Sequence, residues 1–229
     1  STATVASNRK FFYAPDPSLV IPEDDAPYIA LAIGSGNRSH PLNQDVQDRF
    51  YMIKDPNPFA KPAAYPTTLY ESNLLDTTTD LTPDVSNHDG WYIQLADGTG
   101  SSAGNFVGEK VLSESVTFDG TVLFTTFVPV QTASAVDCAP NQGTSAVYAV
   151  NIEDARPVQD LDTTTASNSL TRADRRLELT RTGIAPEVTI LFPPLENIDP
   201  QAIVAAEKLD GIQLDTAPNK TYWFMNEEK

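Results

Sequence analysis

Short runs of β-branched and aromatic residues, each closed by turn residues, are the feature that most restricts the fold of this chain. Runs rich in Val, Ile, Thr, Tyr and Phe are typical of strands. No segment shows an extended helical periodicity. The sequence therefore predicts an all-β fold, a meander of antiparallel strands as in a sandwich or a propeller. The expected strands cover residues 9–14, 28–33, 48–53, 91–95, 110–117, 121–128, 145–152, 176–181, 187–192 and 220–225.

One connection between these strands is unusually long. Residues 57–87 are rich in turn-forming side chains, and the segment is about twice the length at which an unstructured loop becomes unexpected in a compact domain. Either this loop is mobile or functional, or it is an ordered surface loop with a short helix over residues 68–75. The residues leave both interpretations open.

The segment from residue 199 onward also has two interpretations. Asp199 and Pro200 match a helix cap followed by Pro at the first helical position, which would start a helix over residues 202–209. The same eight residues can equally be a buried strand, because periodicity does not decide so short an apolar run. Elsewhere the signal is clearer: Asp119 and Gly120 stand between two expected strands and indicate a hairpin turn.

The charge of the chain excludes several classes of function. Its 229 residues include 31 acidic and 15 basic side chains, so the formal net charge is −16. Proteins that bind phosphate backbones or anionic lipid need clustered Lys and Arg, so we expect neither as a partner. No apolar run approaches the ~20 residues of a membrane-spanning helix, so we expect no membrane span.

One Cys and two His leave no disulfide within the chain and no Cys-rich or His-rich metal centre. Cys138 is either a buried thiol or the partner of a cysteine in another part of a parent protein. The length suits one large all-β domain or two small ones. No signal peptide follows Ser1, so we expect that a leader was removed or that the chain is a piece of something longer.

Residues 34–37, Gly-Ser-Gly-Asn, follow an expected strand and invite comparison with phosphate-binding loops. They lack the Lys and Ser or Thr of a P-loop, the third Gly of a dinucleotide-binding loop and a following helix. We therefore interpret them as a tight turn that needs positive φ.

Acidic residues recur every four positions at Asp76, Asp80 and Asp84, and Asp160 and Asp162 precede another run of Thr. Such oxygen-rich runs can bind a hard cation such as Ca²⁺. A calcium loop of the EF-hand kind needs ligands at alternate positions and a central Gly, and neither run has them. We therefore interpret both as solvated acidic loops.

A hydrolase site is not defined by the sequence. His40 or His88 could act as a base with Ser35, Ser39 or Asp89, but scattered residues do not establish a triad. No Gly-x-Ser-x-Gly motif occurs, and the second His fits a turn before the next strand. We assign no catalytic, cofactor-binding or metal-ligating residue to this chain.

The chain has a single basic cluster, with Asp174 and Glu178 interleaved in it. Mixed charges at short spacing usually form an exposed, ion-paired surface, which is the interpretation we favour here. The members of the cluster are Arg172, Arg175, Arg176 and Arg181.

Residues 29–42, "IALAIGSGNRSHPL", and residues 46–55, "VQDRFYMIKD", are two of several segments that, taken in order, resemble the C-terminal domain of the PilY family of tip-associated adhesins and assembly factors of bacterial type IV pili. The resemblance is most specific over residues 34–42 together with 48–51. The others lie at residues 9–20, 89–95, 108–129, 138–151 and 220–225.

The resemblance implies a modified β-propeller of the quinoprotein type, with antiparallel blades and long loops. Residues 1–229 would then be the C-terminal portion of one propeller domain, because four-stranded blades need more strands than this chain offers. Upstream blades and an N-terminal region would lie outside it. The resemblance also favours a strand over residues 202–209. Family members respond to Ca²⁺ through a run of alternating Asp, which this sequence lacks, so any calcium site would lie elsewhere in the parent protein.

The resemblance implies a non-enzymatic, exported protein at the pilus tip, outer membrane or cell exterior. It would bind minor pilins or a host surface, and residues 57–87 and 96–107 are the expected contact loops. One alternative is a quinoprotein-like propeller oxidoreductase. The other is a secreted carbohydrate-binding module, which would need Trp91 or Trp223 exposed for stacking on a sugar.

Overall fold

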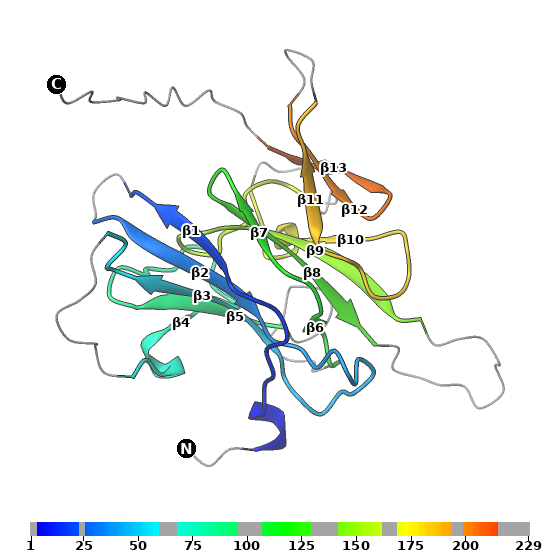
Figure 1. The fold of residues 1–229 in the computed structure, drawn as a ribbon, viewed down its shortest axis with the longest axis horizontal. Helices are drawn as coiled ribbons and strands as arrows, with labels where there is room; N and C mark the ends of the chain where they lie inside the picture. The colour runs from blue at the N-terminus through cyan, green and yellow to red at the C-terminus, as the bar shows by residue number, and fades with distance from the viewer. Residues whose placement is uncertain are drawn as a thin grey trace, which may run out of the picture.

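A computed structural model of the chain describes residues 4–22, 26–59, 68–95, 107–129, 142–161, 169–193 and 199–214. Within them the chain folds into three β-sheets, here called A, B and C, whose strands follow one another in chain order (Figure 1). The all-β prediction is confirmed. The pairing is antiparallel throughout, except that the short β4 runs parallel to β5. The described residues form no closed barrel or complete propeller.

The first sheet has five strands and the second has five, and the third is a three-stranded meander. Sheet A has the order β1-β2-β3-β5-β4, with β1 Asp16–Val20, β2 Tyr28–Gly34, β3 Arg49–Asp55, β5 Gly90–Gln94 and β4 Leu75–Asp76. Sheet B has the order β10-β9-β8-β6, with β10 Arg176–Glu178, β9 Thr144–Asn151, β8 Thr121–Val128 and β6 Lys110–Val111, while β7 Val116–Phe118 also pairs with β8. Sheet C comprises β11 Val188–Leu191, β12 Gln201–Val204 and β13 Glu207–Gln213. Three short 3₁₀ turns complete the elements, η1 Val5–Ser7, η2 Glu71–Asn73 and η3 Ala173–Arg175.

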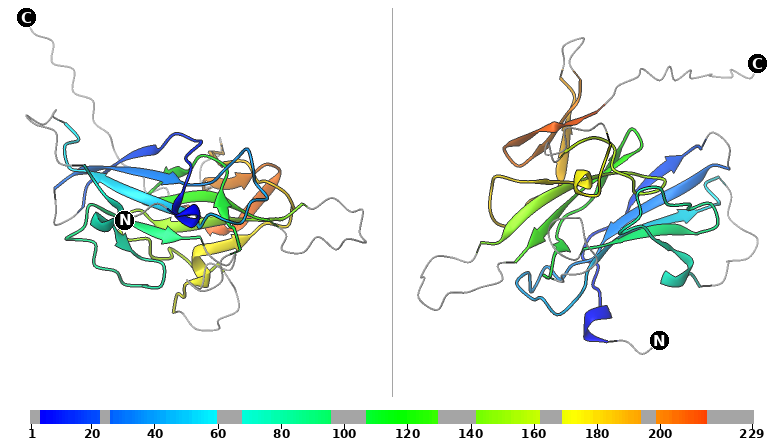
Figure 2. Two further views of the ribbon diagram at one scale, coloured as in Figure 1. Left: turned by 90° about the horizontal axis from the view of Figure 1, so that it is seen from below. Right: turned by 180° about the vertical axis from the view of Figure 1, so that it is seen from behind.

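Sheet B is covered on both faces, by sheet A on one and by sheet C on the other, and Figure 2 shows the same succession from behind. Successive side chains of β8 alternate between the two cores. Phe124 stacks on Phe50 of sheet A at 3.7 Å between ring centres, while Leu123 packs with the apolar side chains of sheet C. This explains why β8 is buried at every position except its two ends, as expected of a strand covered on both sides.

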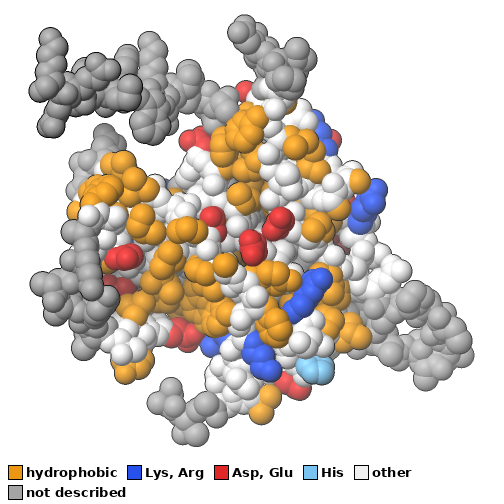
Figure 3. Space-filling model, in the orientation of Figure 1, with side chains coloured by type: hydrophobic (Ala, Val, Ile, Leu, Met, Phe, Trp, Pro, Cys, Tyr) orange, Lys and Arg blue, Asp and Glu red, His pale blue; other side chains and the backbone are white. Residues whose placement is uncertain are grey.

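Sheet A is apolar on both faces, although sheet B covers only one of them. Side chains paired across its strands point to the same side, and on the side away from sheet B these form rows such as Pro17–Leu31–Ile53 and Ile33–Tyr51–Tyr92. Leu19 is 47% exposed. Figure 3 shows hydrophobic side chains gathered where β1 lies in Figure 1. We call this surface the outer face of sheet A, formed by Pro17, Leu19, Ile29, Leu31, Ile33, Tyr51, Ile53 and Tyr92.

The prediction of a strand over residues 9–14 was wrong, because the first strand is β1. Arg9 and Lys10 instead bind the ends of sheet A: the Arg9 Nε donates to the Gln47 carbonyl at 2.8 Å, and the Lys10 carbonyl accepts from the Gly36 N–H. Pro17, which the sequence pattern treats as a strand breaker, lies inside β1. An edge strand tolerates Pro because one of its sides needs no donor.

Three further expectations need adjustment. Residues 110–117 form two strands, β6 and β7, because the chain leaves the sheet between them. Residues 202–209 are strands, as the resemblance implied, but they form the β12–β13 hairpin around Ala205 at φ 53°. In the long connection, a short 3₁₀ helix, η2, lies within residues 68–75, as in the ordered-loop interpretation, but it covers only Glu71–Asn73 and is followed by β4. The hairpin turn at residues 119–120 is confirmed, with positive φ at both positions.

Several predictions fall on residues that the structure does not describe. These are the strand over residues 220–225, most of the expected contact loop at residues 96–107, Cys138, Asp162 and Trp223. The described part of the chain contains no helix with the length and apolar character required to span a bilayer.

Candidate functional site

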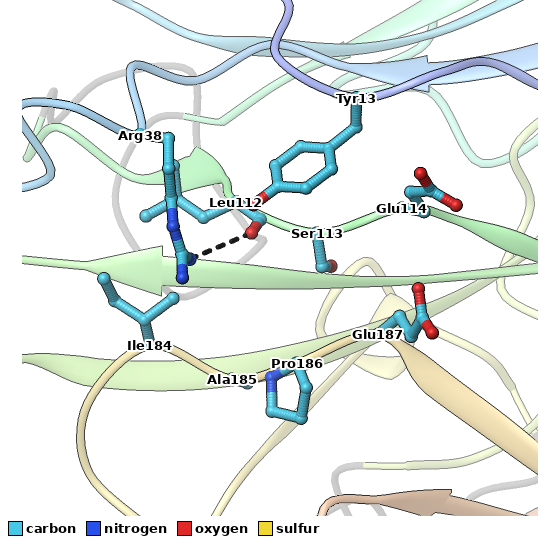
Figure 4. Close-up of a pocket in the computed structure, with 9 residues that line it drawn as sticks. All are labelled: Tyr13, Arg38, Leu112, Ser113, Glu114, Ile184, Ala185, Pro186 and Glu187. Carbon is cyan, nitrogen blue, oxygen red and sulfur yellow. Dashed lines mark hydrogen bonds between the residues drawn. The ribbon is translucent and has the colours of Figure 1, made fainter.

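An open groove of about 390 Å³ lies where segments from all three sheets meet (Figure 4). One wall is the β6–β7 connection, residues 112–114, and the other is the segment before β11, residues 184–187. Tyr13, which precedes β1, and Arg38, which follows β2, complete the lining. No sequence motif marks this site, because its walls are connections between strands.

Hydrogen bonds hold the two walls in place. The Ser113 Oγ and Thr125 Oγ1 hydroxyls bond to each other at 2.6 Å, and the Thr125 hydroxyl donates to the Pro186 carbonyl at 3.1 Å. The Arg38 Nη1 donates to the Leu112 carbonyl at 3.2 Å. Because Thr125 belongs to the fully buried centre of β8, the floor is anchored to the core of the molecule.

Charge is unevenly distributed along the groove. Arg38 lies at one end, and the carboxylates of Glu114 and Glu187 lie at the other, one from each wall (Figure 4). Between them the surface is mostly apolar, with Ile184 and Pro186 opposite the Tyr13 ring. Such a groove can bind an elongated ligand with opposite charges at its ends.

A buried polar junction joins sheets A and B beside this groove. The Ser35 Oγ donates to the Asp48 Oδ1 at 2.7 Å, and both residues are buried. Lys110 is 2% exposed, and its ammonium donates to three backbone carbonyls, those of Pro41, Asn43 and Gly108, at 2.6–2.9 Å. The Val111 N–H donates to the Ser35 carbonyl, so the two sheets share hydrogen bonds here.

The prediction of a positive φ for the glycines at residues 34–37 was wrong. The glycines are there because the backbone of sheet B passes too close for a side chain. A Cβ at Gly34 would overlap the Val111 side chain, and a Cβ at Gly36 would overlap the Val111 carbonyl oxygen. Gly is therefore required here by the close approach of another part of the chain, and not by a positive φ.

Burial shifts the pKa values of both charged groups in the junction. Desolvation raises the pKa of Asp48 to about 6, against the opposing effects of the Ser35 hydrogen bond, Lys110 and Arg9. Desolvation likewise lowers the pKa of Lys110 to about 8, although Asp48 and Glu109 favour its charged form. Both shifts have the sign that burial produces in an acid and in a base.

Asp48→Asn is expected to flatten the pH dependence of stability between about pH 4 and pH 6. The pKa of Asp48 is higher in the folded chain, so its stabilising contribution is complete below pH 3.8 and is lost as pH rises to about 6. A rise of about two pKa units corresponds to a loss of about 3 kcal/mol. Urea unfolding of both proteins from pH 3.5 to 7.5 measures the difference. An equal slope in the variant would show that Asp48 titrates normally, and the exposed turn residue Asp119, changed to Asn, serves as the control.

Asp76, Asp80 and Asp84 each form a turn with the backbone that follows them. Each Oδ1 accepts the backbone N–H two residues later, at Thr78, Thr82 and Ser86. The repeated Asp-x-Ser/Thr pattern thus encodes three successive Asx turns. No group of three or more potential metal-ligating side chains occurs among the described residues.

The loop that contains these turns binds the side chain of Arg175. Its guanidinium is fully buried and donates to the carbonyls of Thr77, Thr78 and Asp80 at 2.6–3.1 Å. Burial lowers its pKa to about 10. The arginine cluster was therefore misinterpreted as an exposed surface. Arg176 is also mostly buried, 3.8 Å from the carboxylate of buried Glu109, whereas Arg181 is exposed.

The remaining sequence candidates lie apart from one another. The Ser35 hydroxyl binds Asp48 rather than a histidine, and His88 belongs to the turn that precedes β5. His40 lines a separate cavity of about 160 Å³ beside the buried junction. Trp91 is fully buried and donates its indole N–H to the Ile152 carbonyl at 2.9 Å, so it cannot stack on a sugar.

A comparison with solved structures finds a similar fold. No protein-family model matches the sequence, and no curated protein matches it. The crystal structure of the Pseudomonas aeruginosa PilY1 C-terminal domain superposes on 84% of this chain with a TM-score of 0.56 and 16% sequence identity. This chain spans 43% of that domain. The all-β chain, with its antiparallel sheets in sequence order, is therefore similar in fold to the PilY1 C-terminal domain over most of its length.

Proposed function

We propose that this chain is the C-terminal portion of a non-enzymatic, exported protein of bacterial type IV pili that contributes to pilus biogenesis and adhesion. The supporting observation is its similarity in fold to the PilY1 C-terminal domain across most of the chain. At 16% identity this likeness concerns the fold, so the pilus role rests on the combination of fold and ordered sequence segments.

The sheets are blades of a β-propeller, and the preceding blade packs on the outer face of sheet A. Sheets A, B and C pack in chain order, so a sheet upstream of A would meet this face. The strand β2, Tyr-Ile-Ala-Leu-Ala-Ile-Gly, has no polar side chain on either face, which is typical of a strand buried on both. The additional length of the PilY1 domain is consistent with such blades.

Contacts with minor pilins or a host surface involve the loop over residues 57–87. Two of its aromatic side chains are among the most exposed apolar groups of the described residues, Phe59 at 77% and Tyr70 at 67%. Exposed aromatic side chains on a connection between rigid strands are typical of protein contact sites. The net charge of −16 favours basic partners and makes their association sensitive to salt.

Deleting the gene in the organism that carries it is expected to remove most surface pili, counted by electron microscopy, and to reduce surface attachment. A plasmid copy of the wild-type gene should restore both. A copy with Phe59→Ser and Tyr70→Ser should restore pili but attach less well, because neither exposed side chain supports the fold. Normal pilus number and normal attachment in the deletion strain would overturn the pilus role.

A further inference from the structure

We propose that the groove between the β6–β7 connection and the segment before β11 binds an extended peptide segment. The segment carries a Lys or Arg at one end, apolar residues in the middle and a carboxylate at the other end. This inference does not depend on the pilus role, because it follows from the shape and charge of the groove alone.

The two carboxylates at one end of the groove have no cationic partner. Glu114 and Glu187 are exposed, come from opposite walls, and make no salt bridge or side-chain hydrogen bond with any described residue. Figure 4 shows them at the same end, so one ammonium or guanidinium group can approach both. A cation between two carboxylates forms charge-assisted hydrogen bonds, which are stronger than neutral ones.

The other end of the groove, at Arg38, favours a negatively charged group. Arg38 uses its Nη1 for the Leu112 carbonyl, which fixes the guanidinium at the edge of the groove. The remaining donors of its planar fork suit a carboxylate. A ligand with charges at both ends therefore has a single favoured direction in the groove.

The walls of the groove are short. Glu114 is two residues from Leu112, whose carbonyl binds Arg38, and Glu187 is three residues from Ile184. At ~3.4 Å per fully extended residue these walls are at most about 7 and 10 Å long. An extended peptide of about four residues is therefore long enough to reach from one charged end to the other. The apolar middle of the groove, with Ile184, Pro186 and the Tyr13 ring, accommodates the two intervening side chains.

Hydrogen bonds to sheet B fix both walls of the groove. The bonds from Ser113 and Pro186 to Thr125 link both walls to β8, and the Ala185 N–H donates to the Ser145 hydroxyl of β9. Binding therefore requires no rearrangement of the walls, and the ordering cost falls mainly on the peptide.

Fluorescence polarisation with labelled tetrapeptides tests the proposal on purified protein that contains the complete chain. The probes are Lys-Leu-Pro-Asp and the peptide with its two charged residues exchanged, Asp-Leu-Pro-Lys, which together cover both chain directions in the groove. All peptides are blocked at both termini, so that only their side chains carry charge. One of the two is expected to bind saturably, and Gln-Leu-Pro-Asn about tenfold more weakly or worse, which is the effect of about 1.4 kcal/mol.

Three variants identify the site. Glu114→Gln combined with Glu187→Gln is expected to weaken binding about tenfold, and Arg38→Gln severalfold. The matched control is Glu153→Gln with Asp119→Asn, which removes the same two charges from exposed positions outside the groove. It should bind as the wild type does.

Three outcomes would overturn the proposal. These are equal binding of the uncharged peptide, unchanged binding by the double variant of the groove, and no saturable binding up to about 5 mM of either charged peptide. None of these depends on pilus counts in a deletion strain, so the peptide site and the pilus role fail separately.

Discussion

Replacing Arg175 with Met is expected to lower the free energy of unfolding by about 3 kcal/mol or more. The guanidinium donates to three carbonyls of the loop that follows β4, and two of the residues concerned, Thr77 and Thr78, are buried. A methionine fills similar space but leaves these acceptors without a donor. Each buried, unsatisfied group costs about 1–3 kcal/mol.

The same change should loosen one particular contact. Arg175 lies in η3 beside sheet B, whereas the loop it binds belongs to sheet A. Hydrogen exchange should therefore increase first at Thr77 and Thr78, before global unfolding. Arg175→Lys should be intermediate, because an ammonium cannot reproduce the planar fork.

Arg181→Met is the matched control for this variant, because Arg181 is exposed and makes no hydrogen bond or salt bridge with the described residues. Its effect should stay within about 0.5 kcal/mol. If the two substitutions cost the same in urea unfolding, the buried guanidinium contributes no more than a surface arginine, and the role assigned to it is wrong.

Lys110→Met is expected to destabilise the chain by a similar amount, about 3 kcal/mol. Three carbonyls around the Lys110 ammonium lose their donor, and Asp48 loses the nearest positive charge. Because both effects act at the contact between sheets A and B, the loss should appear in global unfolding. Lys208→Met, at a half-exposed position on β13, is the control and should cost less than about 0.5 kcal/mol.

A double-mutant cycle separates the two contributions of Lys110. In the Asp48→Asn background no buried carboxylate is left unneutralised, so Lys110→Met should cost about 1 kcal/mol less than in the wild type. Strictly additive effects at pH 7 would show that the two groups do not interact, and the carbonyl contacts would then account for the whole loss.

The strands that were predicted best are those formed by a long run of mostly β-branched, aromatic and other apolar residues. β8 was predicted with its observed bounds and β9 to within one residue, because both are buried on two faces and end at turn residues. β1 was misplaced because an edge position, which sequence pattern does not reveal, makes Pro17 acceptable. The local sequence was therefore sufficient to predict the bounds of central strands, but it was not sufficient to predict an edge strand.

The polar contacts were predicted less well, since they join distant segments. Arg175 binds residues 95 to 98 positions earlier in the chain, and Lys110 binds carbonyls near residue 42. Nothing in a local window identifies either partner. The three Asx turns could have been predicted from the sequence. A Thr or Ser follows two positions after each of Asp76, Asp80 and Asp84, which is typical of such turns.

Lys110 occupies the kind of oxygen cage in which many proteins hold a metal ion, and its ammonium is a cation that is covalently attached to the chain. A chelator can remove a metal ion from such a site, but it cannot remove a side chain that is part of the polypeptide. The Lys110 ammonium loses its charge by deprotonation instead. Because its pKa is about 8, a mildly alkaline medium removes the proton. The contact between the first two sheets thus contains a cation whose charge depends on pH.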